Sequence, residues 1–273
     1  MPKITVHGAS LYYEDTGGDG EPVLFLHGFL FDGRQFEAQI AALRDSHRCV
    51  ALDFRGQGRS AASPGGYQIE QLTADVLAVI RELELGPLHL AGLSMGGFVG
   101  LRIAARHPGL LRSLTLLNTS AGPHNPAKVL SHLLLTAVGR IAGVSLPLVV
   151  SRVEAELYGA PFRDEPAHDA QRLEWRERWA HADRAALAKT MLGIAFRPSV
   201  RDELADIKIP VLIIAGGADV SLPPAQSRQM HSLIPGSRLV ELPGVGHSSP
   251  IEDPGAVTNA LTGFLTEAGG GNR

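Results

Sequence analysis

The sequence predicts an α/β fold: a mostly parallel sheet of eight strands with helices on both faces, interrupted by an inserted helical segment. Short apolar or β-branched runs bounded by turn residues alternate with amphipathic segments of helical length, which is the pattern of such a sheet. Between positions 118 and 211, more than ninety residues show helical periodicity and contain no convincing strand. The chain has 273 residues, 44% of them hydrophobic, which is sufficient for a large core.

The strands are predicted from runs rich in valine, isoleucine and leucine. The first two are separated only by the four-residue link HGAS, which suits an antiparallel hairpin, and we expect the others to be mostly parallel. The predicted strands are Ile4–Val6, Leu11–Glu14, Val23–Leu26, Arg48–Leu52, Leu88–Leu93, Ser113–Asn118, Val211–Ala215 and Arg238–Leu242.

Helices are predicted between these strands, and the long helical interval is expected to form a subdomain of its own because it is too long for an ordinary connection. We therefore expect a core in two parts, residues 1–121 and 196–273, with a helical cap at residues 122–195. The predicted core helices are Arg34–Leu43, Ile69–Leu83, Met95–His107, Pro224–Leu233 and Asp253–Thr266.

A serine ringed by glycines lies at the end of a predicted strand. Residues 92–96 read GLSMG, which matches G-x-S-x-G and is followed by a predicted helix. This motif forms a sharp strand-to-helix turn in which the serine is strained and its hydroxyl is presented at the sheet edge. Glycine at the flanking positions avoids collision with the neighbouring strand and helix. Ser94 is therefore the predicted nucleophile, and an ordinary helix cap is the alternative.

A serine nucleophile needs a histidine to accept its proton. His247 lies in the glycine-rich loop LPGVGHSSP, just after the last predicted strand, and is the predicted base. A solvated loop histidine is the alternative interpretation. His27 precedes the region expected to bind the oxyanion. Surface or packing roles are sufficient for the histidines on predicted strands or at helix ends, namely His7, His47 and His107.

The histidine in turn needs an acid that orients its ring. Asp219 follows the strand Val211–Ala215, and active-site groups of open α/β sheets gather at the carboxyl ends of the strands. Asn118 ends the strand after the serine helix and cannot be the charged partner. Asp219 is preferred over the alternatives Asp206 and Asp253. The nucleophile, acid and base then follow in the chain order of this triad type.

Hydrolysis also requires donors for the developing oxyanion. The segment His27-Gly28-Phe29 ends a predicted strand, where a turn can direct the backbone N–H of Phe29 into the site. The second predicted donor is the backbone N–H of Met95, directly after the nucleophile and at a helix N-terminus. An ordinary turn is the alternative for the His-Gly pair.

Taken together, the segments HGF, LDFRGQGRS, GLSMGG, IAGGADVSLPP and LPGVGHSSPIEDP resemble the α/β-hydrolase superfamily in order and spacing, over nearly the whole chain outside the cap. The resemblance implies that the loop Asp53–Ser60 is structural. It is greatest to small-ester hydrolases, enol-lactone hydrolases and the cofactor-free haloperoxidases that act as esterases and perhydrolases. Dehalogenases and epoxide hydrolases of this fold use aspartate as nucleophile, so a serine disfavours both.

These residues predict a serine hydrolase that cleaves a carboxylic ester or lactone through an acyl-enzyme. The alternatives are a perhydrolase or acyltransferase with the same acyl-enzyme, and a ligand-binding receptor on this fold. The many leucines and valines of the cap favour a small, largely apolar substrate. The tryptophan pair in the cap also fits helix packing. Candidate substrate-binding residues are Phe29, Met95, Trp175, Trp179, Met191 and Val220.

Charge and composition argue against several other classes of function. The net charge is −3 and no local cluster of lysine and arginine is present, so we expect no nucleic-acid partner. The apolar stretch Leu133–Val150 contains Arg140 and Pro147, so we expect no membrane span. We also expect no metal, no cofactor, a buried Cys49 and, because the first residues lack a signal-peptide pattern, a cytoplasmic location. The oligomeric state is not predicted.

Overall fold

The computed structural model describes residues 2–270, and its strands form the predicted eight-stranded sheet, in the order β1-β2-β4-β3-β5-β6-β7-β8. β1 pairs with β2 and β2 with β4 in antiparallel register, and all later neighbours are parallel. The strands are β1 (Lys3–Val6), β2 (Ala9–Asp15), β3 (Glu21–Leu26), β4 (His47–Leu52), β5 (Leu88–Leu93), β6 (Leu111–Leu117), β7 (Val211–Gly216) and β8 (Arg238–Leu242).

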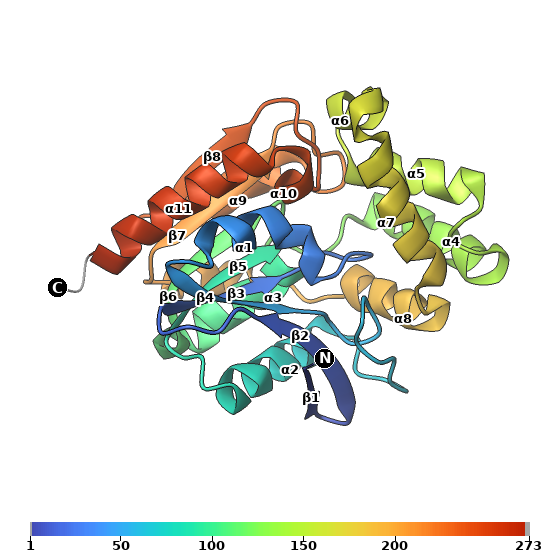
Figure 1. Cartoon of the computed structure of the whole chain (residues 1–273). Helices are drawn as coiled ribbons and strands as arrows, with labels where there is room; N and C mark the ends of the chain where they lie inside the picture. The colour runs from blue at the N-terminus through green and yellow to red at the C-terminus, as the bar shows by residue number, and fades with distance from the viewer. Residues whose placement is uncertain (1, 271–273) are drawn as a thin grey trace.

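Helices cover both faces of the sheet, as predicted (Figure 1). One apolar layer lies between the sheet and α2 (Ile69–Glu82), α3 (Met95–Arg106) and α9 (Pro224–Leu233). The opposite layer contains side chains of α1 (Glu37–Leu43) and α11 (Pro254–Gly270), among them Leu43 and Leu261. The two layers together bury the central strands, which explains their continuous apolar runs.

Two predicted core helices differ from the structure by more than one residue at an end. The predicted helix from residue 34 begins as a 3₁₀ turn, Gly33–Phe36, because the Asp32 carboxylate caps it by accepting from Arg34 N at 3.0 Å. α11 starts at Pro254 and runs to Gly270, and the Asp253 carboxylate accepts from Ala256 N at 3.0 Å. A short helix before it, α10 (Ser249–Glu252), was not predicted.

The inserted segment is helical. Figure 1 shows its helices gathered on one side of the molecule, beyond the sheet. We propose that residues 122–195 act as a cap between core segments 1–121 and 196–273, of which residues 271–273 lie outside the described part of the chain. The helices are α4 (Pro126–Ala142), α5 (Pro147–Leu157), α6 (Ala160–Asp164), α7 (Asp169–His181) and α8 (Arg184–Ala195).

Candidate active site

Ser94 lies in a strained turn between β5 and α3. Its φ is 51° and its ψ is −109°, a combination that is rare for a residue with a side chain. A Cβ on Gly96 would lie 2.1 Å from the carbonyl oxygen of Leu26, and one on Gly92 would lie 2.5 Å from the carbonyl of Gly96. Both positions therefore require glycine, and the turn has the geometry that the G-x-S-x-G motif predicts.

His247 and Asp219 are hydrogen-bonded to each other. Nδ1–H of His247 donates to Oδ2 of Asp219 at 2.7 Å, and both side chains are buried. The other oxygen of Asp219 accepts from Leu222 N at 2.9 Å. The carboxylate thus fixes the ring orientation and leaves Nε2 as the nitrogen that can accept a proton.

Burial and charge act in opposite directions on the pKa of His247. Burial by itself lowers the pKa, because it disfavours the charged ring. The neighbouring Asp219 carboxylate, its hydrogen bond, and the more distant charges of Glu252 and Glu156 outweigh burial, and the pKa of His247 lies above its usual value. The ring therefore binds a proton more readily than an isolated histidine.

Ser94 and His247 line the same cavity, of about 60 Å³, which we call the catalytic cavity. Among the described residues, no hydrogen bond joins Ser94 Oγ to the His247 ring, although in unliganded active sites such bonds are often long and tighten on substrate binding. The lining of the catalytic cavity also includes apolar side chains and two histidines of the cap segment. Among them are Phe29, Phe98, His124, His132, Leu157 and Met191.

Asn118 contacts the acid candidate Asp219 directly, which no sequence motif predicts. It has a φ of 45°, and its side-chain amide donates to Asp219 Oδ2 at 3.0 Å and to the Gly246 carbonyl at 2.9 Å. Its Oδ1 accepts from Ser249 Oγ at 2.6 Å. Asn118 was rejected as the acid because it carries no charge, yet its place at the end of β6 was a signal for a residue that positions the acid.

Glu252 is a second residue that supports the site and that no sequence motif predicts. Its carboxylate accepts from three backbone N–H groups, those of Gly159 at 2.8 Å, Gly246 at 2.7 Å and Ser248 at 2.9 Å. Burial raises the pKa of Glu252 despite these hydrogen bonds. The carboxylate ties the His247 loop to the cap segment, and no short motif in the sequence indicates a contact over that distance.

The loop after β3 carries the proposed oxyanion donor Phe29. Gly28 N donates to Gln35 Oε1 at 2.8 Å, and Leu30 N donates to Gln57 Oε1 at 2.9 Å. Among the described residues, the backbone N–H groups of Phe29 and Met95 have no hydrogen-bond acceptor. The loop is therefore held on both sides of Phe29, while the two candidate donors are left for a ligand.

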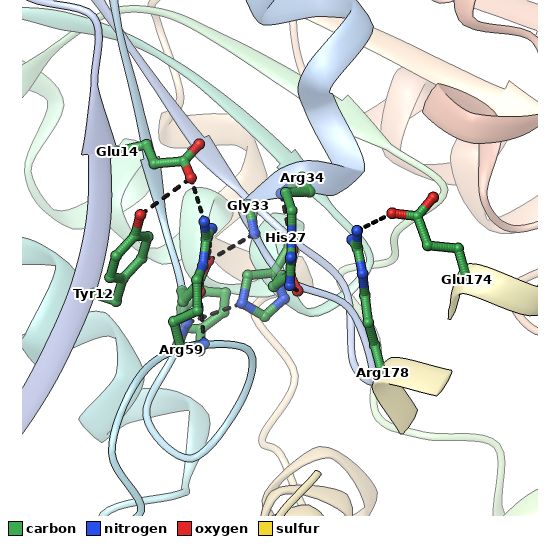
Figure 2. Close-up of polar contacts among 11 residues, drawn as sticks. Tyr12, Glu14, His27, Gly33, Arg34, Arg59, Glu174 and Arg178 are labelled. Atoms are coloured by element: carbon green, nitrogen blue, oxygen red, sulfur yellow. Dashed lines mark hydrogen bonds and ion pairs between the residues drawn. The ribbon is translucent and has the colours of Figure 1, made fainter. Parts of the chain in front are cut away.

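His27 also holds this loop in place through hydrogen bonds to the backbone, and its side chain is fully buried. Its Nδ1–H donates to the Gly28 carbonyl at 2.7 Å, and its Nε2 accepts from Phe54 N at 2.9 Å. Burial lowers the pKa of His27, so the ring is neutral and both nitrogens serve the backbone. Figure 2 shows His27 with its hydrogen bond, next to the polar network of the loop 53–60.

Asp53 begins that loop and is buried. Its Oδ1 accepts from Gly33 N at 2.7 Å and its Oδ2 accepts from Arg59 N at 2.9 Å. Arg59 also pairs with Glu14 on β2. These contacts join two loops at the sheet edge, in agreement with the structural role that the family resemblance implies.

Only some of the predicted substrate-binding residues line the catalytic cavity. Phe29 and Met191 line the catalytic cavity. The side chain of Met95 is fully buried in the core beside Gln57, because at the first helical position it points back toward the sheet. Val220 is 52% exposed, and Ser221 next to it lines the cavity instead. For Met95 and Val220 the expected pocket-facing orientation is therefore corrected.

The cap tryptophans are likewise corrected. Trp175 and Trp179 pack edge-on against Phe31, with ring centroids 4.8 Å and 6.1 Å away. They belong to a buried cluster with Leu157 and Phe162 that joins the cap segment to the core. Their i, i+4 spacing marks the packed face of α7, because large aromatic rings gain more from full burial than from a cavity wall.

A second cavity of about 110 Å³ adjoins the catalytic cavity. The two share the lining residues Phe29, His132, Leu157, Met191 and Ser221. The rest of its wall is mainly apolar and comes from α4, α5 and α8, with Leu135, Val144, Val149, Val153 and Leu187 among its members. A substrate bound at Ser94 can thus extend into an apolar space under the cap segment.

Three other expectations concern features away from this site. Cys49 is buried, and burial raises the pKa of its thiol to about 11, which disfavours a reactive thiolate. Within residues 2–270, no cluster of three or more potential metal ligands occurs. In the same described part of the chain, every helix is too short or too polar to cross a membrane.

This fold and this edge-of-sheet arrangement are those of a hydrolase-type α/β protein, and a family model supports the same class. The model described as alpha/beta hydrolase fold matches residues 21–254. The chain therefore belongs to the α/β-hydrolase family, in agreement with the resemblance stated from its motifs. The names of its relatives place it in the hydrolase class of enzymes.

Solved structures of similar proteins cover nearly the whole chain. An enol-lactonase from Burkholderia xenovorans is 31% identical, with a TM-score of 0.89 over 97% of this chain and 100% of its own. A thermophilic esterase from Thermogutta terrifontis is 30% identical, with a TM-score of 0.87 over 98% and 99%. A bromoperoxidase from Bacillus anthracis, at 24% identity and a TM-score of 0.86 over 94% and 96%, shares the fold.

Proposed function

We propose that this protein is a serine hydrolase that cleaves a carboxylic ester or lactone of a small, largely apolar substrate through an acyl-enzyme on Ser94. The observation that carries the proposal is the cavity that Ser94 and His247 share, with the His247 ring held by Asp219 at 2.7 Å. A strained nucleophile, a base and an orienting acid are the parts that acyl transfer requires. The similar esterase and enol-lactonase structures support the same class of reaction.

The first step is acylation. Nε2 of His247 accepts the Ser94 hydroxyl proton while Oγ attacks the substrate carbonyl carbon and forms a tetrahedral intermediate. The Asp219 carboxylate stabilises the imidazolium that results, because it lies against Nδ1–H. The imidazolium then protonates the leaving oxygen. The carbonyl–oxygen bond breaks, and an ester bond to Ser94 remains.

The second step is hydrolysis of the acyl-enzyme. Nε2 of His247 accepts a proton from water, whose oxygen attacks the acyl carbon. Collapse of this second intermediate returns the proton to Ser94 Oγ and releases the carboxylic acid. In both steps the negative oxygen is stabilised by the backbone N–H groups of Phe29 and Met95, each such donor being worth about 3–4 kcal/mol in a serine protease.

The walls of both cavities support an apolar substrate. Phe29, Phe98, Leu157 and Met191 surround the catalytic cavity, and leucines and valines line the adjoining one. Burying one apolar side chain of this size from water contributes about 1.5–3 kcal/mol. A substrate with a hydrocarbon or aromatic part is therefore favoured over a sugar or a phosphate.

The test is turnover of p-nitrophenyl esters and lactones by the wild type and by Ser94→Ala. We expect kcat to fall by a factor of about 10⁴ or more, because the nucleophile is removed. Ser232→Ala is the matched control, since Ser232 is exposed on α9, and it should retain wild-type rates. Full turnover by Ser94→Ala would refute the assignment. Product analysis with added hydrogen peroxide separates hydrolysis from perhydrolysis.

A further inference from the structure

Two histidines of the cap segment, His124 buried and His132 half-buried, line the catalytic cavity and take no part in the triad chemistry. His124 follows β6, and His132 lies on α4. Both line the cavity that contains Ser94, and His132 also lines the adjoining one. No sequence motif marks either histidine, and together with Ser221 they are polar groups in a mainly apolar wall of the catalytic cavity.

The two rings share one hydrogen bond, which limits where their protons can be. Nε2 of His124 and Nδ1 of His132 are 2.9 Å apart, so one nitrogen donates and the other accepts. Each ring, when neutral, carries one proton. Either both protons are on Nε2 atoms, or both are on Nδ1 atoms. The first arrangement leaves Nδ1 of His124 as an acceptor, and the second makes it a donor.

Glu156 on α5 favours the first arrangement. Its Oε2 lies 4.0 Å from Nε2 of His132, too far for a direct hydrogen bond but close enough for a strong electrostatic effect. Lys128 and Arg152 each lie 3.4 Å from the Glu156 carboxylate and form ion pairs with it. A carboxylate attracts an N–H and repels a bare nitrogen lone pair, so the proton of His132 belongs on Nε2.

The charge of Arg197 acts on the other ring, that of His124. Its guanidinium is buried, donates to the Ile194 carbonyl and to Ser120 Oγ, and lies 3.9 Å from the centre of the Phe98 ring. A positive charge near His124 disfavours an additional proton on that ring, so it helps to keep His124 neutral.

Both rings are neutral at physiological pH. Burial, followed by the charges of Arg197, the His132 ring and Lys128, lowers the pKa of His124 to about 4. Burial also lowers the pKa of His132, more than the Glu156 carboxylate raises it. The proton arrangement derived above therefore applies at pH 7, where neither ring carries a net charge.

We propose that His124 presents Nδ1 as a hydrogen-bond acceptor to the substrate, and that the enzyme selects esters or lactones whose acyl part carries a hydroxyl group. This inference rests on the proposed function and deepens it. Nε2 of His124 is occupied by His132, so Nδ1 is the ring nitrogen left for a ligand, and it has no partner among the described residues. The triad acts on the substrate carbonyl, and His124 forms a hydrogen bond with a second polar group of the substrate.

The energetic basis is the cost of an unpaired polar group. A hydroxyl that donates to Nδ1 satisfies an acceptor in a largely apolar cavity, whereas a methyl group in its place leaves that acceptor unpaired. Sites built to hydrogen-bond a substrate hydroxyl reject analogues without it far more strongly than apolar pockets reject an extra methylene. The histidine pair is then a specificity determinant, and Glu156 is a positioning residue that sets its tautomer.

The experiment compares matched substrates in which a hydroxyl replaces a methyl group. The pairs are the p-nitrophenyl esters of 2-hydroxypropanoate and 2-methylpropanoate, and of 3-hydroxybutanoate and 3-methylbutanoate. The measured quantity is the hydroxyl-to-methyl ratio of kcat/KM, compared between wild type and variant so that intrinsic ester reactivity cancels. We expect His124→Leu to lower this ratio at least fivefold for one pair. A smaller change for both pairs overturns the proposal.

Two variants distinguish recognition from loss of packing. His124→Asn keeps an acceptor close to the position of Nδ1. It should recover more than half of the decrease that His124→Leu causes in the logarithm of the hydroxyl-to-methyl ratio. His181→Leu is the matched control, because His181 is an exposed histidine at the end of α7, and its ratio should equal that of the wild type. Equal ratios for the leucine and asparagine variants at position 124 contradict the proposal.

A readout that needs no catalysis is the ring ¹⁵N NMR spectrum of histidine-labelled protein. We expect Nδ1 of His124 to be unprotonated in the wild type, and its protonated fraction to rise in Glu156→Gln. A protonated Nδ1 in the wild type overturns the inference even if esters are cleaved. If no ester is turned over, the proposed function fails, while the tautomer measurement still stands on its own.

Discussion

The carboxyl edge of the sheet and the cap segment position their side chains in different ways. At the edge, Ser94 directly follows β5, and Asp219 and His247 lie in the loops after β7 and β8. Their places are set by strands, glycines and backbone hydrogen bonds. In the cap segment, side chains such as Trp179 and His132 are placed by helix packing, since each helix could rotate about its axis and present another face.

The difference teaches which functional groups short motifs can predict. A strand end and a turn specify where the backbone goes, so a local pattern is sufficient to identify candidates there. A helix pattern specifies only which residues share a face. What that face contacts depends on distant segments. The three predictions below, from the largest expected effect to the smallest, test this comparison.

The largest effect is expected for Asp219→Asn at the sheet edge. The amide can hold His247 only in the wrong tautomer, and the corresponding change in a serine protease lowers kcat about 10⁴-fold, equivalent to about 5 kcal/mol. Steady-state kinetics at pH 7 measure it. Asp206→Asn, at one of the alternative acids, is the control and should stay close to wild type. A loss below tenfold in Asp219→Asn would remove Asp219 from the triad.

The next effect concerns the backbone. A Cβ at Gly96 would lie 2.1 Å from the Leu26 carbonyl oxygen, so Gly96→Ala should lower the free energy of unfolding by several kcal/mol. Gly139→Ala in α4 meets only side-chain methyl groups, of Val144 at 3.3 Å and of Val149 at 3.9 Å, and higher helix propensity should offset this by about 0.5–1 kcal/mol. Urea unfolding measures both variants. Equal free energies of unfolding for the two variants would contradict the difference between the sheet edge and the cap segment.

The smallest effect is the pH dependence. His247 acts as base only when neutral, and the Asp219 carboxylate raises its pKa against the effect of burial. Activity should therefore be full above this raised pKa and fall about tenfold per pH unit below it, with a midpoint above 6.5. His124 should add no second limb above pH 5, because its pKa is lowered to about 4. A flat kcat/KM profile between pH 5 and 8 would contradict the role of His247.

The fold could be predicted well because hydrophobic periodicity and turn residues are local signals. The predicted strands Leu88–Leu93 and Arg238–Leu242 coincide with β5 and β8, and the ends of the other predicted strands coincide or differ by one or two residues. Errors lie at helix ends, where capping decides: the Asp32 carboxylate converts the predicted start at Arg34 into a 3₁₀ turn.

The candidate site could be predicted only in part. The structure brings Asp219 and His247 into contact and places Ser94 in the same cavity, while catalysis by these residues stays a prediction until it is measured. The supporting residues Asn118 and Glu252 act through contacts far apart in the chain. Sequence spacing contains no information on such contacts.

By itself, the sequence determined the sheet, its order of elements and the candidate nucleophile, acid and base, because period, glycine placement and strand ends are local properties of the chain. Only the tertiary structure decided which cap residues face the cavity. It buried the tryptophans against Phe31 and placed His124 and His132 beside Ser94 instead. The physical reason is that close packing between distant segments, rather than local propensity, sets the rotation of each helix and so the chemistry of the cavity wall.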